Sequence, residues 1–210
     1  MATRGSTPAL TATISLAPLD GNGSVVVPPD AQDALLEIGC SDRSTLDEDM
    51  LDARPHSFLL SFEPQLDKYA VLLARGTKRA HGRVRDRSVQ LGHHHKRGIV
   101  LPLAVSPTGG PVQLSVQHVA GCSSLVALNR RAAWAPWCST HLETRTVPSV
   151  TLTQALAFIP SRLPIALLKV DAQGVDFALI ASTDARLLRR RGVPPPLAAS
   201  MISSCLDAAA

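Results

Sequence analysis

The strongest structural signal in this chain lies in Leu167-Leu168-Lys169-Val170-Asp171-Ala172-Gln173-Gly174-Val175-Asp176. The apolar run Ile165–Val170, interrupted by one lysine, predicts a buried strand that ends at a carboxylate. Gly174 follows three positions later, and residues 177–180 begin a helical pattern. A strand that ends at an acid and turns through glycine into a helix is typical of an open α/β sheet. Such a sheet presents polar groups at the carboxyl edge of its strands.

Other apolar runs fit the same plan. Residues 35–38 predict a first strand followed by Gly39, and residues 58–62 predict a second strand that ends at Glu63. Residues 99–105 predict a third strand. Because helical patterns separate these runs, we expect a mostly parallel sheet with right-handed crossovers. The predicted fold class is α/β, with a Rossmann-like, doubly wound sheet.

Short helices are expected between the strands. Ser44 and Asp47 form a capping-box pattern before a helix with Leu46 and Met50 on one face. Thr151 caps a helix over residues 152–159. Alternation over residues 112–116 predicts a half-buried strand. The buried face of the helix after Glu63 is predicted to hold Leu66, Tyr69, Ala70 and Leu73.

These segments together resemble FkbM-type, class I methyltransferases, which use S-adenosylmethionine. Residues 169–176 are similar to the family's K-I-D-x-E-G-x-E signature, with Gln173 and Asp176 where the family has glutamates. Phe62-Glu63-Pro64 resembles its F-E-P. Residues 34–42 and 98–110 resemble its first strand and loop and its third strand and turn. Residues 121–125 resemble its S-S-L segment and residues 147–152 its V-T-L segment, and all matches follow the family order.

The resemblance implies a site at the carboxyl ends of the strands. S-adenosylmethionine would be bound by Glu37, Gly39, Cys40, Ser41, Asp42, Glu63, Ala104 and Val105. Glu63 would accept the ribose hydroxyl hydrogens, and Gly39 would let the backbone come close to the ligand. Cys40 is interpreted as a small loop residue and not as a nucleophile.

The catalytic residues implied by the resemblance are Asp171 and Gln173. Asp171 would orient or deprotonate the hydroxyl of a small-molecule or glycan acceptor during methyl transfer. Gln173 hydrogen-bonds but cannot act as a base, so an inactive remnant that at most binds the cofactor is the first alternative. A dinucleotide oxidoreductase is a weaker alternative, because residues 39–44 lack the later glycines of G-x-G-x-x-G.

The end of the chain departs from the family. A complete enzyme of this class has seven strands, and the signature belongs to the fourth. After Asp176 come only 34 residues, which include Pro194-Pro195-Pro196. We therefore expect the last strands to be missing and residues 165–170 to form an exposed sheet edge. The predicted divisions are a flexible lead over 1–33, a partial methyltransferase domain over 34–190 and an irregular or weakly helical tail over 191–210.

Charge and hydropathy narrow the possible partners. Residues 75–97 hold eight lysines and arginines and one acid, which invites a basic binding module as a further alternative. Aromatic residues make up only 3% of the chain, so stacking on nucleic acid is disfavoured and a solvated face is the simpler interpretation. No apolar run reaches the ~18 residues of a membrane helix. With no secretory signal either, we expect a cytoplasmic protein without a membrane partner; the oligomeric state stays open.

Metal binding is not expected. The cysteines Cys40, Cys122, Cys138 and Cys205 show no CxxC spacing, and we predict four free thiols in a reducing compartment. His93-His94-His95 would alternate between the two faces of an extended segment, so the three side chains cannot easily bind one ion.

Overall fold

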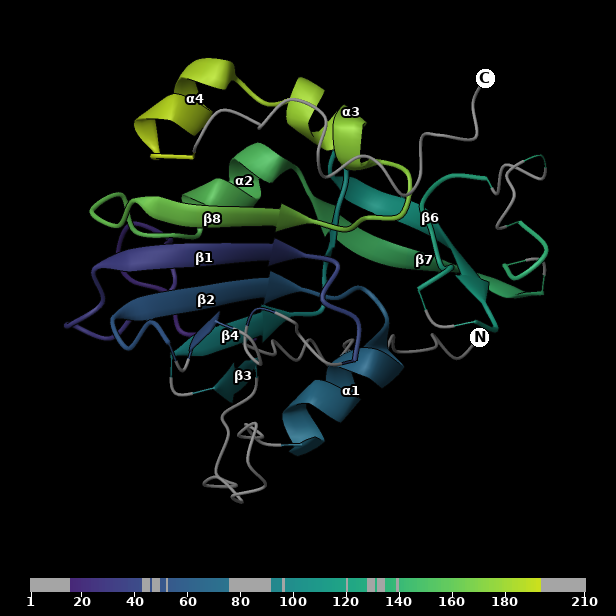
Figure 1. Cartoon of the computed structure of the whole chain (residues 1–210), viewed down its shortest axis with the longest axis horizontal. Helices are drawn as coiled ribbons and strands as arrows, with labels where there is room; N and C mark the ends of the chain where they lie inside the picture. Colours follow the sequence, from purple (N-terminus) through teal and green to yellow (C-terminus); the bar gives the residue numbers. More distant parts are fainter. Residues whose placement is uncertain are drawn as a thin grey trace, which may run out of the picture.

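A five-stranded sheet forms the centre of the molecule (Figure 1). The computed structural model describes residues 16–42, 46, 50–51, 53–75, 92–95, 97–119, 121–127, 131, 135–138 and 140–193. The spatial order of the strands is β3 (His93–His95), β4 (Gly98–Leu101), β2 (Ser57–Phe62), β1 (Asp33–Ile38) and β8 (Ile165–Val170). All neighbours in β4-β2-β1-β8 are parallel, and β3 pairs antiparallel with β4. The predicted α/β class with a mostly parallel sheet is therefore confirmed.

The parallel strands follow a Rossmann-like order. The chain forms them in the order β1, β2, β4 and β8. Across the sheet they lie in the order β4, β2, β1 and β8. The chain therefore builds outward from β1 in one direction and then returns to its other side. This order places a topological switch point between β1 and β8, where open α/β sheets bind their ligands.

Helices cover both faces of the sheet. On one face, Ile38, Phe62 and Ile99 pack against α2 (Leu152–Ala157) and its neighbours. On the other face, Val100 packs against Tyr69 and Leu72 of α1 (Leu66–Arg75). Residues adjacent in a strand point to opposite faces, so strands buried on both sides appear as continuous apolar runs. This is why β1 and β2 were recognisable from the sequence. The strand predicted over 165–170 is present as β8, but the prediction that it is buried is wrong, because only Ile165 is buried and Ala166 is exposed at this edge of the sheet.

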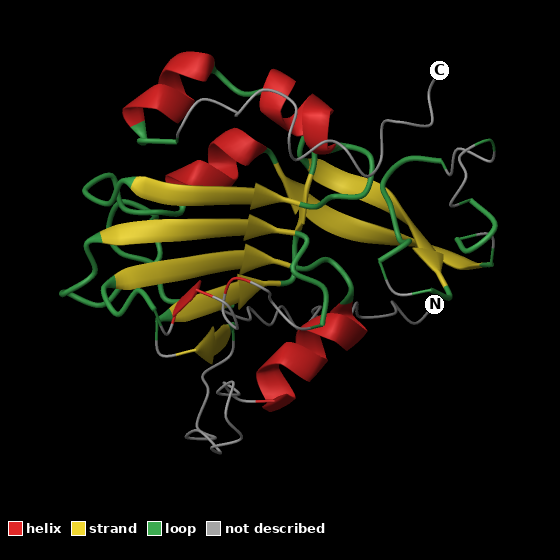
Figure 2. Cartoon of the chain, in the orientation of Figure 1, coloured by secondary structure: helices red, strands yellow, loops and turns green. Residues whose placement is uncertain are grey.

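A smaller sheet extends beyond the carboxyl ends of the large one (Figure 2). Its order is β5 (Ala104–Val105), β7 (His141–Val150) and β6 (Gly110–Gln117), with β6 and β7 antiparallel. The half-buried strand predicted over 112–116 is confirmed. The single strand predicted over 99–105 is wrong, because β4 ends at Leu101 and β5 belongs to the other sheet. Pro102 lies at the break and has no N–H to donate to a ladder.

Three of the predicted helices can be compared with the structure, and the one predicted from residues 177–180 is present over Asp176–Ala181. Thr151 caps α2 as expected: its hydroxyl accepts the amide of Gln154, whose side chain accepts the amide of Thr151. The predicted buried face of α1 is partly wrong, because Leu66 is 64% exposed and Ala70 is exposed. The buried stripe runs instead through Gln65, Tyr69 and Leu72. Ser44 and Asp47 lie outside the described residues.

The predicted boundary at residue 33 also needs correction. Val25 is fully buried, and its amide donates to the carbonyl of Phe158 at 2.8 Å. Ala31 is buried in the same cluster. Residues 16–33 therefore pack against the domain, whereas residues 1–15 and 194–210 lie outside the described part. Apolar residues spaced among glycines and prolines carry no helix or strand periodicity, which is why this packing was not foreseen.

Between β8 and residue 193, where the described part ends, the chain forms two short helices, α3 (Asp176–Ala181) and α4 (Ala185–Arg190). Leu179 of α3 is buried in the main core, and Leu187 and Leu188 of α4 pack against it. Within the described residues β8 pairs only with β1 and lies at an edge of the sheet, as predicted. The described helices include none with the length and hydropathy to cross a membrane.

Candidate functional site

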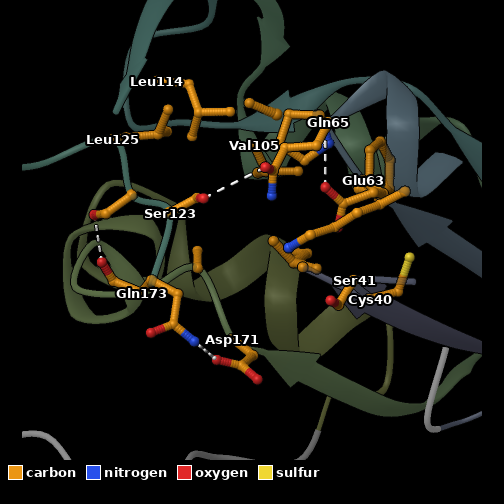
Figure 3. Close-up of a pocket in the computed structure, with 18 of the residues that line it drawn as sticks. Cys40, Ser41, Glu63, Gln65, Val105, Leu114, Ser123, Leu125, Asp171 and Gln173 are labelled. Carbon is orange, nitrogen blue, oxygen red and sulfur yellow. Dashed lines mark hydrogen bonds between the residues drawn. The ribbon is translucent and has the colours of Figure 1, made fainter. Parts of the chain in front are cut away.

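A cavity of about 650 Å³ opens at the carboxyl ends of the parallel strands (Figure 3). Its wall is built by residues that follow β1, β2, β4 and β8, together with a segment between β6 and β7. The cavity thus lies at the topological switch point between β1 and β8. Its volume falls within the ~300–1,000 Å³ that is usual for small-molecule and cofactor sites. It lies where the sequence predicted a site, at the ends of the strands, and most of the predicted site residues line it.

Gly39 is required by the contact between the two central strand ends. Its φ is +76°, and an added Cβ would lie 2.1 Å from the carbonyl oxygen of Asp171. The Asp171 amide donates to the carbonyl of Ile38 at 2.9 Å, which holds the two ends together. Gly39 does line the cavity. The absence of a side chain serves the close approach of the backbone at Asp171. The approach of a ligand to Gly39 stays a prediction.

Glu63 presents a buried carboxylate in the cavity wall. The residue is 3% exposed, and its Oε1 accepts the amide of Gln65 at 2.9 Å (Figure 3). Burial raises the pKa of Glu63, while the amides of Gln65 and Ser41 and the charge of Lys68 act in the opposite direction. A desolvated carboxylate with unused acceptor capacity is suited to bind ligand hydroxyls.

Glu37 does not belong to the cavity wall, although it was predicted to bind the cofactor. Its fully buried carboxylate accepts Lys169 Nζ at 2.9 Å and Ser61 Oγ at 3.3 Å. Lys169 does line the cavity, so Glu37 acts on the site through Lys169. The cause lies in the strand register, which places Glu37 opposite Lys169 and Ser61 on its two neighbours.

The loop after β1 contributes three further residues to the wall, and these are Cys40, Ser41 and Asp42. Cys40 is 2% exposed and packs against Tyr69 and Val100. Burial, with Glu37 and Glu63 nearby, raises the pKa of its thiol well above the usual range. A thiol held in its neutral form is a poor nucleophile, which agrees with the interpretation of Cys40 as a small loop residue.

The opposite side of the cavity is apolar. Ala104 and Val105, both buried, form β5 and line the wall, while their contact with a cofactor stays a prediction. Leu103, Leu114 and Leu125 extend this surface. The cavity therefore combines an apolar side, which suits a flat ring, with a polar side that carries Glu63, Lys169 and Asp171.

Asp171 and Gln173 lie together at the end of β8. Gln173 Nε2 donates to Asp171 Oδ1 at 2.8 Å, and Gln173 adopts a left-handed backbone with φ of +52°. Burial raises the pKa of Asp171. The charge of Lys169 lowers this pKa, whereas the negative charges of Asp176 and Glu37 raise it further. Asp176 itself braces the turn, because its carboxylate accepts the amides of Ala172 and Gly174 at 2.8 and 3.0 Å.

Gln65, Ser123 and Ser124 are site residues that the sequence did not identify. Ser123 Oγ donates to Gln65 Oε1 at 3.4 Å, and Ser124 Oγ donates to the carbonyl of Gln173 at 2.6 Å (Figure 3). The S-S-L resemblance singled out the two serines but implied no position for them. Their hydrogen bonds connect the loop after β2 with the loop after β8.

The prediction of four free thiols is wrong, because Cys122 and Cys138 form a disulfide with a Cα–Cα distance of 5.4 Å. The two cysteines are 16 residues apart, and the ends of the small sheet bring them together. Nothing in their spacing indicated this pair. Within the described residues Cys40 is the free cysteine, while Cys205 lies outside them.

The described residues contain no cluster of potential metal ligands. The side chains of His93–His95 lie outside the description, as do residues 76–91 of the basic block. Comparisons with known proteins yield no match, either to a family model, to a curated protein or to a solved structure. The function is therefore argued from the geometry of the cavity.

Proposed function

We propose that this protein is an S-adenosylmethionine-dependent methyltransferase of the FkbM type, which methylates a hydroxyl group of a small molecule or glycan. The observation that carries the proposal is the buried carboxylate of Glu63 in the cavity at the switch point of the sheet. A carboxylate after the second parallel strand is the group that binds ribose hydroxyls in nucleoside-binding α/β folds. The sequence motifs that resemble those of FkbM-type enzymes favour S-adenosylmethionine over other nucleoside ligands.

The rest of the cavity fits the parts of this cofactor. Leu103, Ala104 and Val105 provide an apolar surface beside Glu63, where the adenine ring would lie. Gly39 and Ser41 line the wall at the end of β1, where the methionine part would lie. In this arrangement Asp171, at the end of β8, would be the acid nearest to the group that is transferred.

Methyl transfer then needs an aligned acceptor at Asp171. S-adenosylmethionine would supply the methyl group: the acceptor oxygen would bond to the methyl carbon as the carbon–sulfur bond breaks, and S-adenosylhomocysteine would leave with the sulfur electron pair. The hydroxyl proton passes to the Asp171 carboxylate, whose raised pKa improves it as a base. Alignment of oxygen, carbon and sulfur supplies much of the rate.

A protein that binds the cofactor without turnover is the second candidate. It is favoured by Gln173, whose amide occupies Asp171 Oδ1 and which stands where the family has glutamate. Binding of S-adenosylhomocysteine would distinguish both candidates from a dinucleotide oxidoreductase. Methyl transfer to an acceptor would distinguish the two candidates from each other.

Calorimetric titration with S-adenosylhomocysteine and, separately, with NADH tests the proposal. We expect micromolar binding of S-adenosylhomocysteine and none of NADH. Glu63→Gln should weaken the binding strongly, whereas Glu143→Gln, a matched change on the exposed part of β7, should leave it unchanged. A folded wild-type chain that does not bind S-adenosylhomocysteine would refute the proposal.

A further inference from the structure

Residues 121–125 form a strap along the wall of the cavity. Four of them, Gly121, Ser123, Ser124 and Leu125, line it. The strap reaches the loop after β2 through Ser123 and Gln65, and it reaches the loop after β8 through Ser124 and Gln173 (Figure 3). It therefore spans the two loops between which a ligand would lie.

The strap is attached on one side by hydrogen bonds to β6. Ser124 and Ser115 exchange amide–carbonyl bonds of 3.0 and 2.9 Å, and the Gln117 amide donates to Ser123 Oγ at 3.1 Å. Each such bond adds only modestly to the net stability of the folded chain. These bonds by themselves hold the strap weakly.

The second attachment is covalent. Cys122 immediately precedes the two serines, and its disulfide joins it to Cys138, which is 6% exposed, just before β7. The bond closes a loop over a sequence separation of 16 residues. A cross-link over such a loop strongly restricts the conformations open to the segment.

We propose that Cys122 and Cys138 are positioning residues of the cavity, whose disulfide holds the strap closed over the ligand, so that reduction by a dithiol weakens binding there. The identity of the ligand rests on the proposed function. A thiolate of the dithiol attacks one cysteine sulfur, and its second thiol then resolves the mixed disulfide. The dithiol loses two electrons and becomes a cyclic disulfide, while Cys122 and Cys138 each become a thiol.

Hydrogen exchange measured by mass spectrometry, with and without dithiothreitol, tests in the absence of ligand whether the disulfide holds the strap. We expect faster exchange in residues 115–125 of the reduced chain, with unchanged exchange in β1 and β2. Titration with S-adenosylhomocysteine should show binding weaker by about five- to ten-fold after reduction, which is the effect of losing one strap hydrogen bond. Equal exchange of the strap in both forms would overturn the inference, whatever the ligand does.

Two variants separate positioning from general stability. The double variant Cys122→Ser, Cys138→Ser should bind as the reduced wild type does and should not respond to dithiothreitol. Ser124→Ala keeps the disulfide and removes the 2.6 Å bond to Gln173, and it should weaken binding in the oxidised chain. Ser124→Ala binding as tightly as the wild type would count against the strap. If S-adenosylhomocysteine binds neither form, but hydrogen exchange in the strap still depends on reduction, the proposed ligand is rejected. The role of the disulfide in holding the strap is then retained.

Discussion

Replacement of Gly39 by alanine should destabilise the protein more than any ordinary glycine substitution. The residue has φ of +76°, and its new Cβ would lie 2.1 Å from the carbonyl oxygen of Asp171, a backbone atom. Backbone cannot rotate away as a flexible side chain can. The end of β8 must therefore move away from β1, at the point where the Asp171 amide bonds the carbonyl of Ile38.

The expected magnitude has two parts. A non-glycine residue in the left-handed region costs roughly 1–2 kcal/mol. Overpacking against a fixed neighbour adds roughly 1–3 kcal/mol, which includes the weakened strand-end hydrogen bond. The sum is about 3 kcal/mol for Gly39→Ala. In a domain of this size that corresponds to a fall in Tm of roughly 6–12 °C.

Gly23→Ala is the matched control for this experiment. Gly23 has almost the same φ, +79°, but no atom lies within 4 Å of its added Cβ. We expect Gly23→Ala to cost only the backbone part, about 1 kcal/mol. Urea unfolding of both variants measures the difference. Equal losses of stability would show that β1 and β8 do not approach as described, and the architecture of the site would then be wrong.

Three further predictions concern the site and its support. Glu63→Gln should lower the affinity for S-adenosylhomocysteine by roughly 30- to 150-fold, from the loss of ~2–3 kcal/mol of charged hydrogen bonding. Because burial raises the folded-state pKa of Glu63, the ionised carboxylate destabilises the folded protein above that pKa. Glu63→Gln should therefore have a larger free energy of unfolding than the wild type at neutral pH. This difference, measured by urea unfolding, should shrink as the pH falls from the raised pKa towards the ordinary value of 4.5. A difference that grows on acidification would contradict the prediction. Lys169→Met should lower the free energy of unfolding by about 3 kcal/mol, because it leaves the carboxylate of Glu37 buried without its ammonium partner. Adding Glu37→Leu should recover part of this loss. A double-mutant cycle that shows no coupling energy between the two positions would exclude the ion pair. Thr151→Ala should cost about 1 kcal/mol through loss of the helix cap, measurable by thermal unfolding, while Thr151→Ser should be nearly neutral.

Local patterns in the sequence were enough to place the central strands and the main helix cap. The runs that became β1 and β2 are apolar because both faces of those strands are covered. The run that became β8 is also apolar, although that strand is only partly buried. The cap at Thr151 needs only the residues of one turn. The acid at the end of β2 followed from the same local signals, and it does lie in the cavity.

The partners of these residues depended on the tertiary structure. Glu37 and Lys169 are 132 residues apart, and they pair because the register of β1 and β8 sets them side by side. β7 was missed because half of its length is exposed and polar, and only its pairing with β6 makes it a strand. The disulfide and the strap likewise depend on how the ends of that pair are brought together. A short segment encodes its own periodicity, but which distant segment meets it is decided by the register and packing of the whole sheet.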